Sequence, residues 1–303
     1  MAAWGSRTKG GNLYSMRNLD WEQNSGINKN KLLFVWKVKG TIPHVTIGYP
    51  GVIGALTGMS KAGLTVHEAG LGSMKETELG YQWTLRLRFI LMHCKNLAEA
   101  KEFWLKTENT FGMNHMVASS ADLHSRSAPV FVIETMRGYN AFFEDNDPRE
   151  DGTIFVDPKT KEKFRAGFAM KDAVFRTNHN YDKTITKFRT TLLTAKDNSL
   201  YRYKIMKDTL NKYEGRSAKI GELEALNITA NVADKGGDDF DFYHCPKAGN
   251  NHGNNIISAM FIPGEQRMYV AMEYGEGKTY QTACCSVYLN MDLSSWFKTS
   301  AEK

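Results

Sequence analysis

Near the start of the chain, an arginine, an amide and a carboxylate lie within four residues of one another, in the segment Arg17-Asn18-Leu19-Asp20-Trp21. Arginine carries a permanent positive charge, an amide both donates and accepts hydrogen bonds, and a carboxylate accepts them. Side chains of these kinds can bind and orient a polar group in a cleft. They can equally form a surface ion pair between Arg17 and Asp20 and a turn at Asn18, so the residue types alone leave both interpretations open.

The short motifs of several large enzyme classes are missing from the sequence. It has no Gly-x-x-x-x-Gly-Lys-Ser/Thr, no Gly-x-Gly-x-x-Gly after a strand, no His-Glu-x-x-His and no Gly-x-Ser-x-Gly, which argues against nucleotide, zinc and α/β-hydrolase sites. Residues 249–255 (GNNHGNN) hold one histidine among asparagines and glycines, a composition typical of a turn-rich loop. A metal site needs more ligands than this. We therefore expect no metal and no cofactor.

The composition is that of an ordinary globular protein, with 303 residues of which 42% are hydrophobic and 24% charged. The net charge of +6 is mild and the lysines are scattered among acids, so nucleic-acid binding is not expected. No stretch approaches the ~20 apolar residues that span a bilayer, and stable membrane insertion is not expected either. Four cysteines are too few and too irregularly spaced for a disulfide framework or a zinc site, and we expect vicinal Cys284 and Cys285 to be small buried residues.

The first third of the chain is typical of β-structure. Alternating patterns and turn signals predict strands over residues 12–21, 31–38, 45–49, 52–57 and 64–66. In the first of these, alternation places Leu13, Ser15, Arg17 and Leu19 on one face. Arg17 and Asp20 then point to opposite faces, unless the strand ends or bulges near Leu19.

A helical period follows these strands. Apolar residues at Trp83, Leu87, Ile90, Leu91 and Cys94 fall on one helix face. Asn96, with Glu99 three residues later, resembles a capping box and begins a second helix. Farther along, the patterns predict a second pair of helices over residues 201–213 and 220–230, a solvated hairpin over 159–165, and strands over 116–121, 130–135, 153–156, 256–262, 268–272 and 286–289. We expect the strand over 153–156 to extend the sheet.

This order of strands, two helices, strands, two helices and strands predicts an α+β fold, a four-layer αββα sandwich of two mainly antiparallel sheets between helical layers. Strict alternation of strand and helix is absent, which disfavours doubly wound and barrel α/β folds. No internal repeat supports a solenoid. We expect a single domain that spans residues 1–303.

Several segments, in order, resemble the N-terminal-nucleophile hydrolases that act on linear amides. This group includes choloylglycine hydrolase, penicillin V acylase, the isopenicillin acyltransferases and acid ceramidase. The resemblance extends to about residue 275, and it implies the same αββα sandwich. It rests on the segments Ala2-Ala3-Trp4-Gly5, Thr8-Lys9-Gly10-Gly11, Met16-Arg17-Asn18-Leu19-Asp20-Trp21, Gly58-Met59-Ser60-Lys61-Ala62-Gly63-Leu64, 88–100, 114–122, 130–134 and Thr177-Asn178-His179.

The resemblance implies a mechanism in which the first residue of the mature chain is a cysteine nucleophile and its α-amine is the general base. Arg17 is then expected near the sulfur, where its charge lowers the thiol pKa, and Asp20 to accept a hydrogen bond from the terminal amine or the substrate amide. Asn178 is expected to donate to the oxyanion of the tetrahedral intermediate. Asn18, His179 and Trp83 are expected to contact the substrate, a small-molecule or lipid amide.

The expected cysteine is missing from the start of this sequence. Alignment on the Arg17-Asn18-Leu19-Asp20 segment places the nucleophile at Met1 or a few residues before it. Methionine has no ionisable nucleophile, and Ser6 and Thr8 lie too late in the strand. Two hypotheses remain: the sequence is an incomplete version of an active amidase that lacks its precursor segment, or it is a noncatalytic paralogue that binds an acyl ligand in the same cleft.

The expected location of the protein depends on which of these two hypotheses holds. The chain as written indicates a cytosolic protein, and a missing precursor segment would indicate a lysosomal or secreted one. The oligomeric state stays open. Four aromatic residues are candidates for an apolar acyl pocket, with core packing as the alternative; they are Trp4, Tyr81, Trp83 and Phe143.

Overall fold

The computed structural model describes residues 1–22, 25–26, 29–125, 127–190, 193–194, 196–235, 244–247 and 253–298. Residues 249–252 of the asparagine-rich segment, with its histidine, lie outside this part of the chain. Among the described residues, no helix combines the length and hydropathy needed to cross a bilayer. The same residues contain no group of three or more His, Cys, Asp or Glu side chains that could hold a metal ion.

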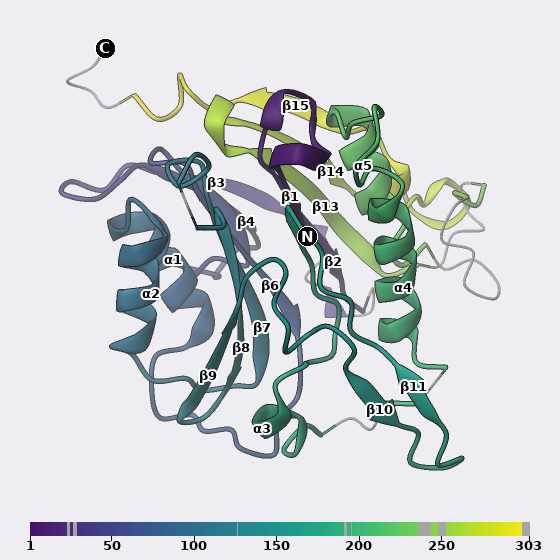
Figure 1. The fold of residues 1–303 in the computed structure, drawn as a ribbon. Helices are drawn as coiled ribbons and strands as arrows, with labels where there is room; N and C mark the ends of the chain where they lie inside the picture. Colours follow the sequence, from purple (N-terminus) through teal and green to yellow (C-terminus); the bar gives the residue numbers. More distant parts are fainter. Residues whose placement is uncertain are drawn as a thin grey trace.

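Two antiparallel sheets form the centre of the fold (Figure 1). The six-stranded sheet has the order β12-β1-β2-β13-β14-β15, and the seven-stranded sheet follows the chain from β3 to β9. The strands of the first are β1 (Ala2–Ala3), β2 (Tyr14–Asp20), β12 (Ala173–Val174), β13 (Asn255–Ile262), β14 (Arg267–Met272) and β15 (Leu289–Asp292). Those of the second are β3 (Leu32–Trp36), β4 (His44–Gly48), β5 (Thr57–Ser60), β6 (Leu64–Gly70), β7 (Met113–Ser119), β8 (Val130–Met136) and β9 (Tyr139–Phe143).

Helices cover the outer faces of both sheets. The pair α1 (Trp83–His93) and α2 (Leu97–Leu105) lies on the seven-stranded sheet, and the pair α4 (Asn198–Asn211) and α5 (Glu222–Ala230) lies on the six-stranded sheet (Figure 1). A single turn, α3 (Lys183–Thr186), follows β12. The layers therefore form the αββα sandwich that the sequence predicted.

The boundaries of the elements show where the sequence patterns succeeded. The Asn96 side chain accepts from the Glu99 amide at 2.9 Å and the Glu99 carboxylate accepts from the Lys95 amide at 2.8 Å, so the predicted cap begins α2. Residues 153–156 were expected to extend a central sheet. That was wrong, because β10 (Ile154–Val156) pairs only with β11 (Lys163–Arg165) in a separate hairpin.

Two other strand boundaries were also wrong. The strand expected over residues 52–57 begins only at Thr57, since the preceding residues form a turn and a loop. The last strand begins at Leu289, because residues 283–285 form a 3-10 turn. Tight turns of this kind satisfy backbone groups locally and therefore shift the start of a strand without changing the apolar pattern.

The expectation for the cysteines was wrong for one of the vicinal pair. Cys285 forms a disulfide with Cys245, with the Cα atoms 5.7 Å apart and a sequence separation of 40. Cys284 is a free buried thiol, as predicted. Sequence spacing does not reveal which two cysteines the fold brings together over such a separation. Two further cysteines, Cys94 and Cys284, remain free thiols, so the sequence alone could not identify the bonded pair.

The strand β2 has one face toward each layer. Ser15 Oγ lies 2.8 Å from both Thr65 Oγ1 and His67 Nε2 of the opposite sheet, and Asn18 Nδ2 donates to the Thr229 carbonyl of α5 at 2.7 Å. The strand ends at Asp20, where the register of the neighbouring strand β13 shifts. This is the irregularity that the sequence required if Arg17 and Asp20 were to serve one site.

A buried ion cluster joins β8 to the segment after β12. Arg176 Nε lies 3.0 Å from Glu134 Oε1 and its Nη1 lies 2.8 Å from Glu150 Oε2, with all three side chains at most 5% exposed. Glu134 also accepts from the amides of Tyr181 and Asp182 at 2.8 Å each. The cluster therefore holds the backbone of residues 176–182, which includes Asn178.

Replacement of Arg176 by alanine is expected to lower the free energy of unfolding by about 3–5 kcal/mol, because it leaves two carboxylates buried without their cation. Urea unfolding followed by circular dichroism measures this loss. Arg165→Ala is the matched control, since its pair with Asp151 is half exposed and contributes at most about 1 kcal/mol. Equal losses in the two variants would contradict a structural role for the buried cluster.

Candidate active site

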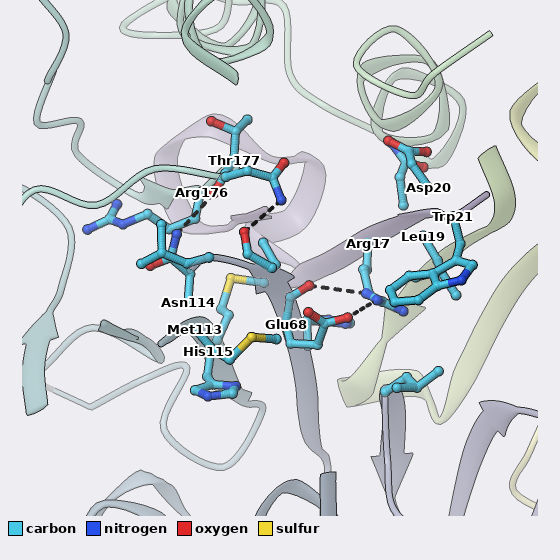
Figure 2. A pocket seen from close by; sticks show the side chains of 18 of the residues that line it. Arg17, Leu19, Asp20, Trp21, Glu68, Met113, Asn114, His115, Arg176 and Thr177 are labelled. Carbon is cyan, nitrogen blue, oxygen red and sulfur yellow. Dashed lines mark hydrogen bonds and ion pairs between the residues drawn. The ribbon is translucent and has the colours of Figure 1, made fainter. Parts of the chain in front are cut away.

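A cavity of about 1180 Å³ opens beside the end of β2 and reaches between the two sheets (Figure 2). Its walls combine charged side chains with apolar ones. Five of the six residues predicted from the sequence line it: Arg17, Asn18, Asp20, Trp83 and Asn178. Residues from other elements that also line it include Met1, Met16, Tyr49, Leu56, Glu68, Phe111, Met113, Asn114, Met116, Arg176, Arg202, Met206 and Asp234.

Arg17 is held against the opposite sheet by Glu68. Its Nε donates to the Glu68 carbonyl at 3.1 Å and its Nη2 forms an ion pair with the Glu68 carboxylate (Figure 2). Burial raises the pKa of Glu68, and the adjacent Arg17 charge opposes that rise. Arg17 Nη1 is buried and has no hydrogen-bond partner among the described residues. The guanidinium is thus fixed at the cavity wall with one donor group unused.

Asp20 is paired with an amide and not with Arg17. Asn255 Nδ2 donates to its Oδ1 at 2.8 Å, and the Asp234 amide approaches the same oxygen at 3.4 Å. Burial raises the pKa of Asp20, and the charge of Arg202 opposes this rise. The alternative of an Arg17–Asp20 surface ion pair is therefore not found in this structure, where Arg17 binds Glu68.

The Asn178 side chain lies at the cavity rim. Its Nδ2 donates to the Gly70 carbonyl at 2.8 Å, and its Oδ1 accepts from Arg202 Nη2 at 2.7 Å. The amide of Asn114 donates to the carbonyls on both sides of Asn178, those of Thr177 at 3.0 Å and His179 at 2.9 Å. Because a carboxamide nitrogen has two hydrogens, one N–H of Asn178 remains for a bound group.

His179 and three of the aromatic candidates lie elsewhere. The His179 ring is buried, with Nε2 2.6 Å from Tyr181 Oη and Nδ1 2.8 Å from Ser199 Oγ, and burial lowers its pKa well below the usual value. It borders a smaller neighbouring cavity of about 350 Å³ and does not line the large one. Trp4 and Phe143 pack in the core and Tyr81 is exposed, so only Trp83 of the aromatic candidates lines the large cavity.

Asn18 lines the cavity, but both ends of its amide are engaged within the protein. Its Nδ2 donates to the Thr229 carbonyl, and its Oδ1 accepts from Ser258 Oγ at 2.8 Å. These contacts tie β2 to α5 and to β13. A role in positioning β2 thus accompanies the expected contact with substrate.

The chain start lies inside the protein at this cavity. The Met1 amine donates to the Met16 carbonyl at 2.9 Å, and Ala2 pairs with Ser15 across the β1–β2 ladder. Burial lowers the pKa of this amine to about 5, so it is neutral at pH 7. In this antiparallel register, the position directly before Met1 lies opposite Arg17.

Glu68, Arg202 and Asn255 were not predicted as site residues from the sequence. Each contacts a predicted residue only after folding, and each comes from a different element. Glu68 lies two residues beyond the strand predicted over residues 64–66, and nothing in that segment marks it as a partner of Arg17. Nothing in the local sequence pairs Arg202 with Asn178 or Asn255 with Asp20, since 24 and 235 residues separate them.

Arg17→Met is expected to destabilise the fold by about 3–5 kcal/mol near neutral pH, because Glu68 is left as a buried unpaired charge. The loss should shrink as the pH falls toward 5. Glu68 has a raised pKa in the folded state, so it takes up a proton there before it does in the unfolded chain. Urea unfolding between pH 5 and 8 measures the effect.

The double variant Arg17→Met with Glu68→Gln is the control for that experiment. It removes both charges together and should recover most of the lost stability. A loss that is the same at every pH, or one that the second substitution fails to relieve, would contradict the assignment of the effect to Glu68.

Comparison with known proteins places this geometry in context. Residues 6–276 match the family model described as acyl-coenzyme A:6-aminopenicillanic acid acyl-transferase. A search of curated protein sequences found no match. Among solved structures, a C2A mutant of the conjugated bile acid hydrolase from Clostridium perfringens aligns with a TM-score of 0.58 at 12% identity, covering 97% of this chain and 93% of the other.

Two further solved structures share the fold. Penicillin V acylase from Agrobacterium tumefaciens aligns with a TM-score of 0.54 at 12% identity, over 89% of this chain and 81% of its own. The N-acylethanolamine-hydrolyzing acid amidase ortholog from Caenorhabditis elegans aligns with a TM-score of 0.52 at 12% identity, over 87% and 92%. These neighbours confirm the N-terminal-nucleophile hydrolase fold that the sequence predicted.

The match to the family model covers most of the chain, and it confirms the resemblance to the amide-cleaving N-terminal-nucleophile group. The same match indicates amide-bond hydrolase or acyltransferase activity of this type. The place of the nucleophile and the roles of the individual side chains stay predictions. The chain belongs to the acyl-coenzyme A:6-aminopenicillanic acid acyl-transferase family.

Proposed function

We propose that the protein cleaves or transfers the acyl group of linear amides with a cysteine thiol at residue 1 or directly before it. One observation carries the proposal: Arg17 and Asp20 of β2 and the distant Asn178 line one cavity together with the buried chain start. A structural ion pair or a turn would not require these residues to converge on the N-terminus. Convergence of a cation, an amide donor and a neutral amine is what thiol catalysis at a chain start needs.

The chemistry divides into two steps. The α-amine takes the thiol proton while sulfur bonds to the amide carbonyl carbon, and the Asn178 N–H donates to the oxygen that becomes negative. The C–N bond then breaks, and the leaving amine takes the proton from the ammonium. Water, or a second amine, attacks the resulting thioester and releases the thiol. Arg17 stabilises the thiolate, and Asp20 accepts from the substrate amide or the terminal amine.

The cavity supports a small-molecule or lipid amide as substrate. Its volume of about 1180 Å³ lies above the usual range for small-ligand sites, which ends at about 1,000 Å³, so it can hold a sizeable acyl group. Its apolar wall contains several methionines, whose flexible, polarizable side chains adapt to irregular ligands; they are Met1, Met16, Met113, Met116 and Met206. The charged side chains lie near Asp20 and Asn178, where the amide would be placed.

Three forms of the chain test the proposal. One carries Met1→Cys, with the cysteine made N-terminal by removal of a tag, one carries a single N-terminal cysteine directly before Met1, and the control carries Met1→Ala. We expect one cysteine form to hydrolyse fatty-acyl or phenoxyacetyl amides and iodoacetamide to abolish the turnover. The internal free thiols, Cys94 and Cys284, are buried with pKa values raised to about 12 and about 11, so alkylation is expected to select the N-terminal thiol.

Failure of both cysteine forms to turn over any amide would contradict the proposal. Retention of an acyl amide without turnover, measured by equilibrium dialysis, would instead favour the noncatalytic acyl-binding protein. In the active form, Asn178→Ala is expected to lower kcat by about 10²–10³, because it removes the oxyanion donor. Asn290→Ala, on the exposed edge strand β15, is the matched control and should leave kcat unchanged.

The pH dependence of kcat tests the role of the amine. Burial lowers the pKa of the amine at residue 1 to about 5, so the neutral base is present above that pH and is lost below it. In the Met1→Cys form, whose amine is the one at residue 1, kcat is expected to fall about tenfold for each pH unit below 5. If kcat instead falls with an apparent pKa near the ordinary α-amine value of about 8, the amine is solvated or is not the base.

A further inference from the structure

Asn255 contacts Asp20 from the neighbouring strand of the sheet. It has no exposed surface, and its Nδ2 donates to Asp20 Oδ1 at 2.8 Å. The same nitrogen lies 3.2 Å from the Ile257 carbonyl, across the point where the register of β13 shifts. The irregularity in β13 thus brings the Asn255 amide to the end of β2.

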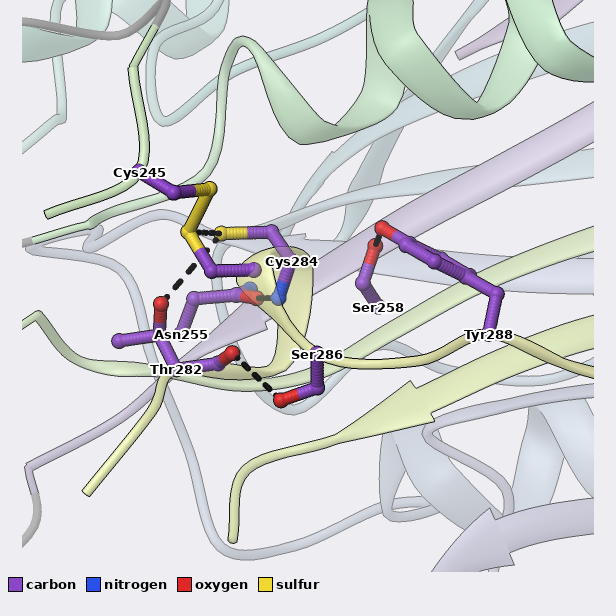
Figure 3. The surroundings of a disulfide bond; sticks show 8 residues. Cys245, Asn255, Ser258, Thr282, Cys284, Ser286 and Tyr288 are labelled. Carbon is purple, nitrogen blue, oxygen red and sulfur yellow. Dashed lines mark hydrogen bonds between the residues drawn. A yellow bond between two sulfur atoms is a disulfide. The ribbon is translucent and has the colours of Figure 1, made fainter. Parts of the chain in front are cut away.

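The other end of the Asn255 side chain is fixed by Cys284. The Cys284 amide donates to Asn255 Oδ1 at 2.8 Å (Figure 3). A backbone N–H can only donate, so it binds the oxygen of the carboxamide and leaves the NH₂ group for Asp20. A flipped carboxamide would point its oxygen at the Asp20 carboxylate and lose both hydrogen bonds. Cys284 therefore determines which end of Asn255 faces Asp20.

The turn that carries Cys284 is tied down by the disulfide. Residues 283–285 form a 3-10 turn, in which the Cys285 amide donates to the Thr282 carbonyl at 3.1 Å. Cys285 is bonded to Cys245, which lies on a distant part of the sequence (Figure 3). The contacts form one chain from the disulfide through the Cys284 amide and the Asn255 carboxamide to Asp20.

We propose that Asn255 is a positioning residue for Asp20, and that the Cys245–Cys285 disulfide controls the site by holding the turn that orients Asn255. This inference rests on the proposed function for the role of Asp20 in turnover. Reduction of the disulfide is expected to release the turn, to free the Asn255 carboxamide to rotate, and to lower the rate of amide cleavage without removing the acyl cavity.

The redox step needs an external reductant, a dithiol or a phosphine. A dithiol gives two electrons and two protons, so that Cys245 and Cys285 become thiols and the dithiol becomes a disulfide. A phosphine gives the two electrons and becomes the phosphine oxide, and water supplies the oxygen atom and the two protons. Cys284 does not substitute for it, although its Sγ lies 3.9 Å from Cys285 Sγ. Burial raises the pKa of Cys284 to about 11, which keeps it a thiol and a poor attacking group.

Several charges face Asp20 and enter its titration. Burial raises its pKa most, and the charge of Asp234 after α5 adds to that rise, whereas Arg202 of α4, the Asn255 hydrogen bond and the Asp234 amide lower it. Loss of the Asn255 donor therefore moves the pKa of Asp20 further upward. A purely structural role for Asn255 would change stability but leave this titration alone.

The test is a ¹³C NMR titration of the Asp20 carboxyl group in the full chain, assigned with Asp20→Asn. In Asn255→Leu, and in the unmutated protein after reduction by a phosphine, the pKa of Asp20 is expected to rise by about one unit or more, the size of a charged hydrogen bond. Asn290→Leu, on exposed β15, and Cys94→Ser are the controls and should not shift it. If the pKa of Asp20 is unchanged in the reduced protein, the proposed role of the disulfide is overturned. If it is unchanged in a folded Asn255→Leu variant, the proposed role of Asn255 is overturned.

Kinetics in the active cysteine form separate this inference from the proposed function. Reduction is expected to lower kcat about tenfold or more, with KM changed less than about twofold, since a positioning residue acts on the step and not on binding. The reduced, unmutated chain keeps the test open if Asn255→Leu does not fold. Turnover that is indifferent to reduction would overturn the regulatory role, whereas a chain with no turnover in any form contradicts the proposed function and leaves the titration to decide the role of Asn255.

Discussion

The pairing of β1 with β2 is the constraint on which the rest of the site depends. A strand of only two residues, Ala2 and Ala3, lies between β12 and β2 and fixes the register of the chain start. Its amine is buried against the Met16 carbonyl, and burial favours the neutral form of an amine. The position of the chain start and its protonation state therefore have one physical cause. The same register places the preceding position opposite Arg17.

Buried arginines hold the cavity walls in place around that chain start. Arg17 ties β2 to β6 through Glu68, and Arg176 ties β8 to the segment that contains Asn178 through Glu134 and Glu150. Each cation binds carboxylates that would otherwise be desolvated without a partner. The walls consequently combine fixed charges near the amide position with an apolar surface that can receive an acyl group. Electrostatic support for catalysis and structural support for the sandwich use the same residues.

The sequence predicted the layers of the fold well, because the strands and helices carry strong periodic patterns and a clear cap at Asn96. It also identified Arg17, Asp20 and Asn178, which line one cavity. It assigned His179 to the substrate pocket, although its ring is enclosed by Tyr181 and Ser199. Neighbouring positions in a motif are not neighbours in space, and alternation along the backbone sends Asn178 and His179 in different directions.

Partners that join distant segments could not be found in the same way. Glu68, Asn255 and the Cys245–Cys285 disulfide join residues that are far apart in the sequence and meet only in the folded chain. Local patterns report which residues are buried, but they do not report which buried polar groups meet. A bulge such as the one between Asn255 and Ile257 shifts the pairing of side chains across the two strands by one residue.

The central claim, acyl transfer to a thiol at the chain start, is tested most directly by intact-mass spectrometry of the cysteine forms during turnover of an activated acyl amide. We expect a mass increase equal to one acyl group, mapped by peptide fragmentation to the N-terminal cysteine and lost on treatment with hydroxylamine. An acyl group on Cys94, Cys284 or a lysine, or no adduct under conditions that give turnover, would contradict the account.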